Sequence, residues 1–267
     1  MLHRVFLLSI AAATVATMSA PVQAQKVVAV GDEWLLSDTA FTNNTVNTTN
    51  FALNIASEFD EGNPAASFLA YSSNFGLTGG SLAAAMTGAG YSWTVSTAQP
   101  FTLATLNTYQ GVFLGGTPGS GGANAAVLAA YVNGGGNVFV MAGTGEFGSA
   151  PGEASAWDPF LNTFGLGFGS TWFESASVVP ITVVPSANPL QSGVSTVTWG
   201  FGQSAFETNP ANTLTDTAIT GQFSTNQPIV STFGIGSVSV PESGTVALLM
   251  GGALPLAIAL VRRRRML

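Results

Sequence analysis

The stretch YQGVFLGGTPGSGGANAAVLAAYVNGGGNVFVMAG, residues 109–143, decides the fold class. It contains two short apolar runs, 111–115 and 137–141, that are bounded by glycine, a pattern typical of strands buried on both faces. Between them, apolar residues recur at helical spacing over 123–133, and three glycines then end the helix. A strand, a helix and a strand in this order predict a right-handed βαβ unit in a parallel sheet.

The chain before residue 173 repeats this alternation. Further buried strands are predicted at 25–31, 67–71 and 91–95, and further helices at 48–59, 82–86 and 157–164. The polar stretch 42–50 predicts a solvated loop instead.

Beyond about residue 173 the chain becomes rich in Val, Ser and Thr. Additional strands are predicted there at 178–184, 196–200 and 228–240. We therefore expect an α/β fold with a flavodoxin-like parallel sheet, helices on both faces and extra β segments toward the C-terminus. An antiparallel sandwich is the alternative.

The run 109–143, with SANPLQSGVSTVTWGFG at 186–202, is similar to class I glutamine amidotransferase-like domains, including trehalose-utilisation-type relatives. The resemblance extends over about 27–206 and implies a flavodoxin-like sheet. Working members of that family carry a cysteine on a sharp turn after a strand and a histidine farther along. Here the turn reads Met-Ala-Gly-Thr-Gly, residues 141–145, so the resemblance supports the sheet and does not bring the activity.

The first residues have the pattern of a signal peptide. His3 and Arg4 precede the apolar run 5–13, and small residues then lead to a cleavage site between Ala24 and Gln25. We expect residues 1–24 to direct export and to be removed by signal peptidase.

The last residues predict a membrane span. Residues 244–261 are uncharged and would extend about 27 Å as a helix, close to the thickness of a bilayer core. Four arginines follow, which predicts a cytoplasmic C-terminus; they are Arg262, Arg263, Arg264 and Arg265. The alternative is a buried helix at the end of a domain.

The motif before this span is Val240, Pro241, Glu242 and Ser243. With the span and the arginines it resembles the PEP-CTERM sorting signal of Gram-negative bacteria, in which a proline usually stands where this chain has Ser243. The resemblance implies an exosortase-type membrane protease as partner, transient residence in the inner membrane, and then the cell surface or the extracellular space. The expected organisation is a signal peptide at 1–24, an α/β domain at 25–225, a strand or linker at 226–240 and the sorting signal at 241–267.

Composition excludes several chemistries between the two ends. Of thirteen acidic residues only Glu242 lies beyond residue 240, and of six basic residues only Lys26 lies between residues 25 and 240. That region also lacks cysteine and histidine. Imidazole-dependent nucleophilic catalysis, zinc sites of Cys and His, and nucleic-acid binding are therefore not expected.

Ligands of open α/β sheets bind at the carboxyl ends of the strands. The polar residues that follow the predicted strands are Asp32, Glu33, Ser72, Ser73, Thr117, Thr144 and Glu146. Among them, Thr144 is a candidate nucleophile with Glu146 as the nearby base, and Asp32 and Glu33 are candidate catalytic acids.

Two other groups of residues are candidates for binding. Glu58, Asp60 and Glu61 could ligate Ca²⁺, although their spacing is not that of an EF-hand. The tryptophans could stack on sugars where they are exposed, which makes exopolysaccharide a candidate partner; they are Trp34, Trp93, Trp157, Trp172 and Trp199.

Three hypotheses follow for the function. The leading one is a non-catalytic surface or matrix protein without a cofactor, linked to exopolysaccharide and biofilm. The second is a carboxylate-based hydrolase, which needs two of the candidate acids to converge in a cleft and which clustering of Asp32, Glu33 and Glu146 would favour. The third is a calcium-stabilised adhesion module, which clustering of Glu58, Asp60 and Glu61 with backbone carbonyl groups would favour.

Overall fold

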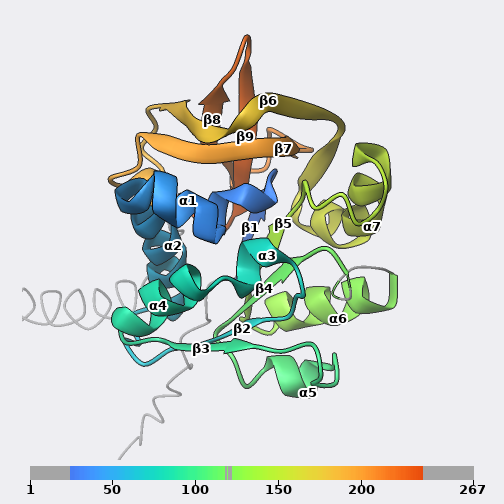
Figure 1. Cartoon of the computed structure of the whole chain (residues 1–267). Helices are drawn as coiled ribbons and strands as arrows, with labels where there is room; N and C mark the ends of the chain where they lie inside the picture. Colours follow the sequence, from blue (N-terminus) through green and yellow to red (C-terminus); the bar gives the residue numbers. More distant parts are fainter. Residues whose placement is uncertain (1–24, 118, 120–121, 237–267) are drawn as a thin grey trace, which may run out of the picture. The chain divides into compact units, whose positions relative to one another are not determined.

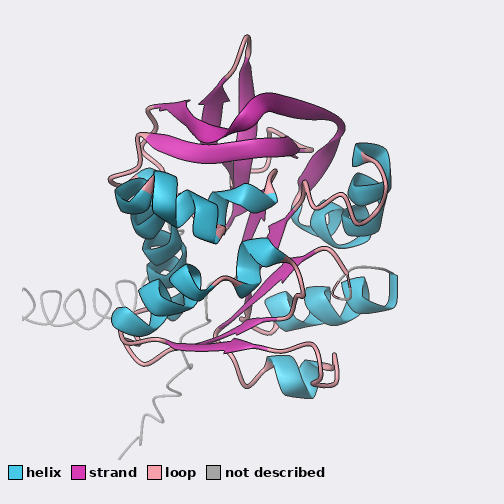
Figure 2. Cartoon of the chain, in the orientation of Figure 1, coloured by secondary structure: helices cyan, strands magenta, loops and turns pink. Residues whose placement is uncertain are grey.

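The computed structural model describes residues 25–117, 119 and 122–236. Within these ranges the chain forms a mixed α/β fold around a nine-stranded sheet (Figure 1, Figure 2). The predicted sorting motif at 240–243, the span at 244–261, Arg262 to Arg265 and the signal peptide lie outside the described residues. No helix in the described part of the chain has the length and apolar character needed to cross a membrane.

One half of the sheet is parallel, as the sequence predicts. Its strands are β1 (Lys26–Val30), β2 (Ser67–Ala70), β3 (Ser92–Val95), β4 (Gly111–Gly115) and β5 (Asn137–Met141). β5 pairs in parallel with β4 on one side and with β1 on the other. The prediction of parallel strands around the 109–143 stretch is therefore confirmed, and the antiparallel sandwich is excluded.

The order of the strands differs from the flavodoxin-like one that the sequence suggests. A flavodoxin-like sheet has its first strand between the second and the third. Here the order is β3-β2-β4-β5-β1, so that β1 lies at the far side of the parallel half. The reason is that β1 uses its second edge to pair with an antiparallel strand, β9 (Asn226–Phe233).

The other half of the sheet is antiparallel and more extensive than predicted. Its strands continue in the order β9, β8 (Thr215–Gln222), β6 (Leu166–Val184) and β7 (Thr196–Glu207). Because β9 lies between β1 and β8, it belongs to the same sheet, and the predicted domain boundary at residue 225 does not separate it.

Helices cover both faces of the parallel half (Figure 1). They are α1 (Asp38–Asn43), α2 (Thr45–Asp60), α3 (Phe75–Thr78), α4 (Gly80–Gly88), α5 (Leu103–Leu106), α6 (Gly122–Asn133) and α7 (Ala150–Leu161), with short 3-10 helices η1 (Glu33–Leu36), η2 (Asn162–Phe164) and η3 (Pro189–Gln191). Alternate residues of each strand enter two apolar clusters, because successive side chains of a strand point to opposite faces. Phe113 packs with α2 and α4, and Val112 packs with α6 and α7.

The polar stretch 42–50 is helical and not the predicted loop. It forms the end of α1 and the start of α2, and its asparagines bond the chain just before β7. Asn47 accepts from the Ser195 backbone at 2.7 Å, and Asn50 donates to the Gly193 carbonyl at 2.8 Å. The polar side chains of this stretch hydrogen-bond α2 to the loop before β7. The composition of the stretch does not reveal this role.

Candidate functional site

Acidic residues from separate parts of the chain meet at the carboxyl end of the parallel strands. Glu33 follows β1, Asn74 follows β2 and Glu146 follows β5. The Nδ2 atom of Asn74 lies 2.5 Å from Glu33 Oε2 and 3.5 Å from Glu146 Oε1. Glu33 and Glu146, two of the three acids expected to cluster, thus share Asn74 as a donor that the sequence interpretation did not name, although Glu33 alone of the three expected acids lines the adjacent cavity.

Glu33 borders a cavity that Trp34, Trp172 and Phe201 also line. Only 8% of the residue is exposed. Burial raises the pKa of Glu33 to about 7; the bond from Asn74 opposes this rise, and the neighbouring Glu153 and Glu146 add to it. A large share of Glu33 is therefore protonated near neutral pH.

Asp32 is fully buried beneath β7. Its carboxylate caps η1 by accepting from Trp34 N at 3.0 Å, and it accepts from Gly200 N at 2.6 Å. Burial raises the pKa of Asp32 to about 8, against the lowering effect of these two bonds. Asp32 does not line the cavity, so the structure assigns it to the support of the site.

The fourth acid, Glu153, was not among the predicted site residues. It is fully buried in the first turn of α7. Its carboxylate accepts from Gly143 N at 2.8 Å and from the Thr144 hydroxyl at 2.5 Å. Burial raises the pKa of Glu153 as well, although its bonds with Thr144 and Gly143 lower it. The sequence signal that could have identified Glu153 is its position in the first turn of the helix that follows β5.

The predicted pairing of Thr144 with Glu146 is wrong. The Thr144 hydroxyl donates to Glu153, and only the backbone N–H of Glu146 contacts that hydroxyl, at 3.3 Å. The Glu146 carboxylate instead accepts from the backbone and the hydroxyl of Thr117, each at 2.7 Å. Thr144 is therefore paired with Glu153, and Glu146 is paired with Thr117.

Two other residues predicted at this edge have structural bonds. Ser72 is buried and donates its hydroxyl to the Gly115 carbonyl at 2.6 Å, while Ser73 is exposed and donates to the Thr117 carbonyl at 3.5 Å. The two side chains therefore connect the loop after β2 to the last residue of β4 and to the chain that follows it.

A basic side chain beside these acids would keep them ionised, but Lys26 lies at the opposite end of β1. Lys26 is the one basic residue within the described ranges, and it pairs with Glu58 at 3.2 Å. Because no positive side chain among the described residues reaches the acid cluster, burial and mutual repulsion favour protonated carboxyl groups there.

Aromatic side chains border the acids. A cavity of about 290 Å³ is lined by Glu33, Trp34, Gly143, Thr144, Gly145, Trp172 and Phe201. Phe201 is 46% exposed, and Phe75 packs on Trp34 with ring centroids 4.6 Å apart. Of the predicted sugar-stacking candidates, Trp34 and Trp172 border this cavity, whereas Trp157 and Trp199 are buried in the core. Trp93 is half-buried and packs on Phe113.

The calcium candidates do not form a shared site. Glu58 pairs with Lys26, and Asp60 accepts from the Tyr91 hydroxyl at 2.6 Å. Glu61 ends α2 in the left-handed conformation. The part of the chain that the structure describes contains no group of three or more acids that could hold a metal ion.

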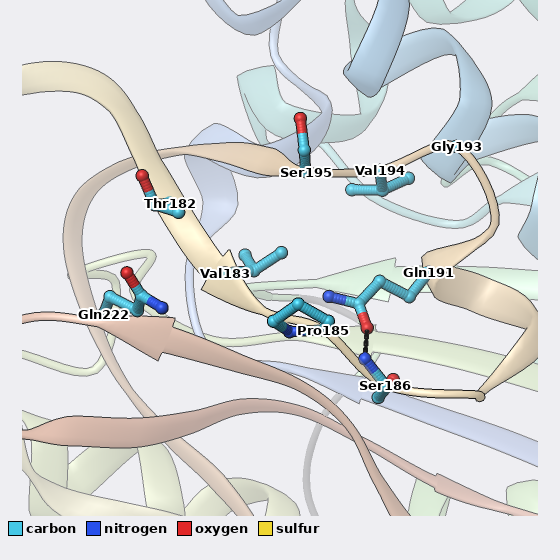
Figure 3. A pocket seen from close by; sticks show the side chains of 9 residues that line it. All are labelled: Thr182, Val183, Pro185, Ser186, Gln191, Gly193, Val194, Ser195 and Gln222. Carbon is cyan, nitrogen blue, oxygen red and sulfur yellow. Dashed lines mark hydrogen bonds between the residues drawn. The ribbon is translucent and has the colours of Figure 1, made fainter.

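A larger cavity, of about 690 Å³, lies at the end of the antiparallel half (Figure 3). Its lining includes no charged residue from the described part of the chain, and several of its polar groups already have partners within the protein. Gln191 bonds the Ser186 backbone and the Val184 carbonyl, and the Ser195 hydroxyl bonds Asn47. The acid cluster is therefore the better candidate site.

Comparisons with protein-family models, curated proteins and solved structures found no match to this chain.

Proposed function

We propose that the chain is an exported cell-surface or extracellular-matrix protein whose folded domain is a carboxylate-based hydrolase that acts on carbohydrate. The observation that carries this proposal is the position of the Asn74 amide, which lies within hydrogen-bond distance of both Glu33 and Glu146. Clustering of the acids favours the hydrolase over the other two hypotheses that the sequence raised.

The two acids suit complementary roles because their surroundings differ. Glu33 is buried and has a raised pKa, so it is suited to donate a proton as general acid. Glu146 is exposed to solvent, where a carboxylate can activate water as general base. Asn74 orients both groups.

Carbohydrate is the substrate class that the cavity wall supports. Trp34, Trp172 and Phe201 line the cavity beside Glu33, and sugar rings stack on exposed aromatic side chains. The scarcity of basic residues in the domain disfavours polyanionic substrates, so a neutral exopolysaccharide is the proposed partner.

The proposed route to the cell surface rests on the two ends of the chain. Signal peptidase would cut between Ala24 and Gln25, and Arg262 to Arg265 would hold the C-terminus in the cytoplasm. An exosortase-type protease would then process the motif at 240–243 and release or transfer the domain. The domain would be a relative of the amidotransferase-like family that lacks its cysteine and histidine and has a different order of strands.

Non-catalytic recognition of the same polysaccharide is the second candidate. It is favoured by the contacts of Glu146, whose carboxylate already accepts two bonds from Thr117. A carboxylate held in this way has fewer lone pairs available for water, and the site would then bind a ligand without cleaving it.

Hydrolysis of a panel of neutral and acylated polysaccharides by the exported protein tests the proposal. We expect Glu33→Gln and Glu146→Gln to lower the rate at least about 100-fold, because each removes a proton-transfer group. Glu207→Gln is the matched control, since Glu207 bonds Thr215 and Thr217 and does not line the acid site. Binding without product release would support the recognition role, and neither binding nor release would contradict both candidates.

A further inference from the structure

Thr144 has the surroundings of an activated nucleophile. Its hydroxyl donates to Glu153 Oε1 at 2.5 Å, and the residue lines the same cavity as Glu33. Glu153 is fully buried, whereas Thr144 is half-exposed. A hydroxyl on a residue that lines a cavity, and a buried carboxylate that accepts its hydrogen bond, are the two parts of a nucleophile and base pair.

The turn after β5 fixes the direction of this hydroxyl. Gly143 and Gly145 have φ angles of 75° and 67°, in the left-handed region that favours glycine. Glu153 also accepts from Thr144 N at 3.1 Å, so the carboxylate holds the backbone and the side chain of Thr144 together. The pair is therefore oriented before any substrate binds.

We propose that Thr144 is a catalytic nucleophile with Glu153 as its general base, and that the bond cleaved is an ester. This proposal adds a nucleophile and a bond type to the proposed hydrolase. It rests on the proposed function for the carbohydrate that carries the ester. It assigns the first step to Thr144 and Glu153, keeps Glu33 as the general acid, and in the second step makes Glu33, in place of Glu146, the base that activates water.

The first half of the reaction forms an acyl-enzyme. The Thr144 oxygen bonds the acyl carbon while its proton passes to the Glu153 carboxylate. The bond between the acyl carbon and the alcohol oxygen breaks, and that oxygen takes the proton of the Glu33 carboxyl group. The alcohol leaves, with Glu153 protonated and Glu33 ionised.

The second half restores the enzyme. Water gives a proton to the Glu33 carboxylate as its oxygen bonds the acyl carbon. The ester bond to Thr144 breaks, and the threonine oxygen recovers its proton from Glu153. One ester and one water thus become one acid and one alcohol. Burial, which raises the pKa of Glu153, makes it a stronger base than an ordinary carboxylate.

Acylation of the full chain by p-nitrophenyl acetate, followed by intact-mass and peptide mass spectrometry, tests the inference. We expect a single acetyl group on Thr144 in the wild type and in Thr144→Ser, and none in Thr144→Val. Thr217→Val is the matched control that should still be acylated, because the Thr217 hydroxyl also donates to a glutamate, Glu207, at 3.0 Å.

The role of Glu153 requires a second readout. We expect Glu153→Gln to lower the acylation rate at least about 100-fold, and to remove the rise of that rate with pH that ionisation of Glu153 causes in the wild type. A purely structural role would change stability but would leave the shape of the pH profile intact. An adduct that persists in Thr144→Val, or a folded wild type that is not acylated, would overturn the inference.

Different results would contradict the carbohydrate hydrolase and the Thr144 nucleophile. Polysaccharide hydrolysis that survives Thr144→Val would leave the carboxylate hydrolase standing and remove the nucleophile. Acylation at Thr144 without activity on any polysaccharide would support the nucleophile and remove the carbohydrate substrate.

Discussion

The backbone N–H of Gly200 donates to Oδ2 of Asp32 at 2.6 Å, across 168 residues of sequence. Gly200 lies in β7, in the antiparallel half of the sheet, and Asp32 follows β1 in the parallel half. The antiparallel half thus closes over the carboxyl end of the parallel strands and keeps Asp32 away from water. The raised pKa of Asp32 follows from this cover.

The folded domain should be more stable in mild acid than at slightly alkaline pH. The pKa of Asp32 is about 8 in the folded protein against an ordinary 3.8, and Glu33, at about 7, acts in the same direction. As pH rises, the unfolded chain releases these protons first, so stability is greatest below about pH 4 and falls until pH passes about 8.

Thermal unfolding at pH 5, 6, 7 and 8 measures this effect. We expect the free energy of unfolding to fall by more than about 1 kcal/mol across the series. Asp38, whose pKa is lowered by its bond to Ser81, is ionised in both states over this range and does not contribute. In Glu33→Gln the decrease should be smaller, and a stability that rises with pH would contradict the assignment.

Gly202→Ala should destabilise the domain by about 1 to 3 kcal/mol, because the added methyl group overpacks the contact of β7 with the site. A Cβ at Gly202 would lie 2.5 Å from the Gly31 carbonyl oxygen and 2.6 Å from Asp32 Cβ. Gly88→Ala is the control, since nothing lies within 4 Å of a Cβ there. Equal denaturant midpoints for the two variants would show that β7 does not pack closely against Gly31 and Asp32.

Calcium and chelators should leave the unfolding temperature unchanged. Glu58 is paired with Lys26 and Asp60 with Tyr91, so these carboxylates are not arranged around an ion. Differential scanning fluorimetry with Ca²⁺ and then with EDTA measures the effect. A clear stabilisation by Ca²⁺ would restore the adhesion-module hypothesis.

Processing at the C-terminal motif should remove the predicted span. Intact-mass analysis of protein from the native host should find a species that ends near Val240, free or with an adduct. Replacement of Arg262 to Arg265 by neutral residues should weaken retention and reduce processing, because the positive charges orient the span. A mature form that still contains these arginines would mean that the tail is a permanent anchor.

The parallel half could be predicted from sequence because its signals are local. The runs 111–115 and 137–141 carry their own glycine boundaries, and the helix between them brings them into register. The same reasoning correctly placed Asp32, Glu33 and Glu146 at one edge of the sheet, since the carboxyl ends of parallel strands lie together.

The antiparallel half of the sheet and the position of Glu153 in the site depend on contacts between residues that are distant in the sequence. β6 is long and irregular, with shifts of register near Phe168 and Glu174, so no single periodicity marks it. Glu153 looks like an ordinary first-turn acid of a helix until the turn at Thr144 is seen to lie against it. The place of β9 beside β1 is likewise set by pairing, which one strand's sequence does not reveal.

The pH dependence of polysaccharide hydrolysis by the wild type and by Glu33→Gln tests the central claim most directly. If Glu33 is the general acid, the wild-type rate should fall as pH rises above about 7, where Glu33 loses its proton. Glu33→Gln should then be at least about 100-fold slower at pH 6 and lack this decline. A Glu33→Gln variant that hydrolyses the polysaccharide at the wild-type rate, with the same pH profile, would contradict the account.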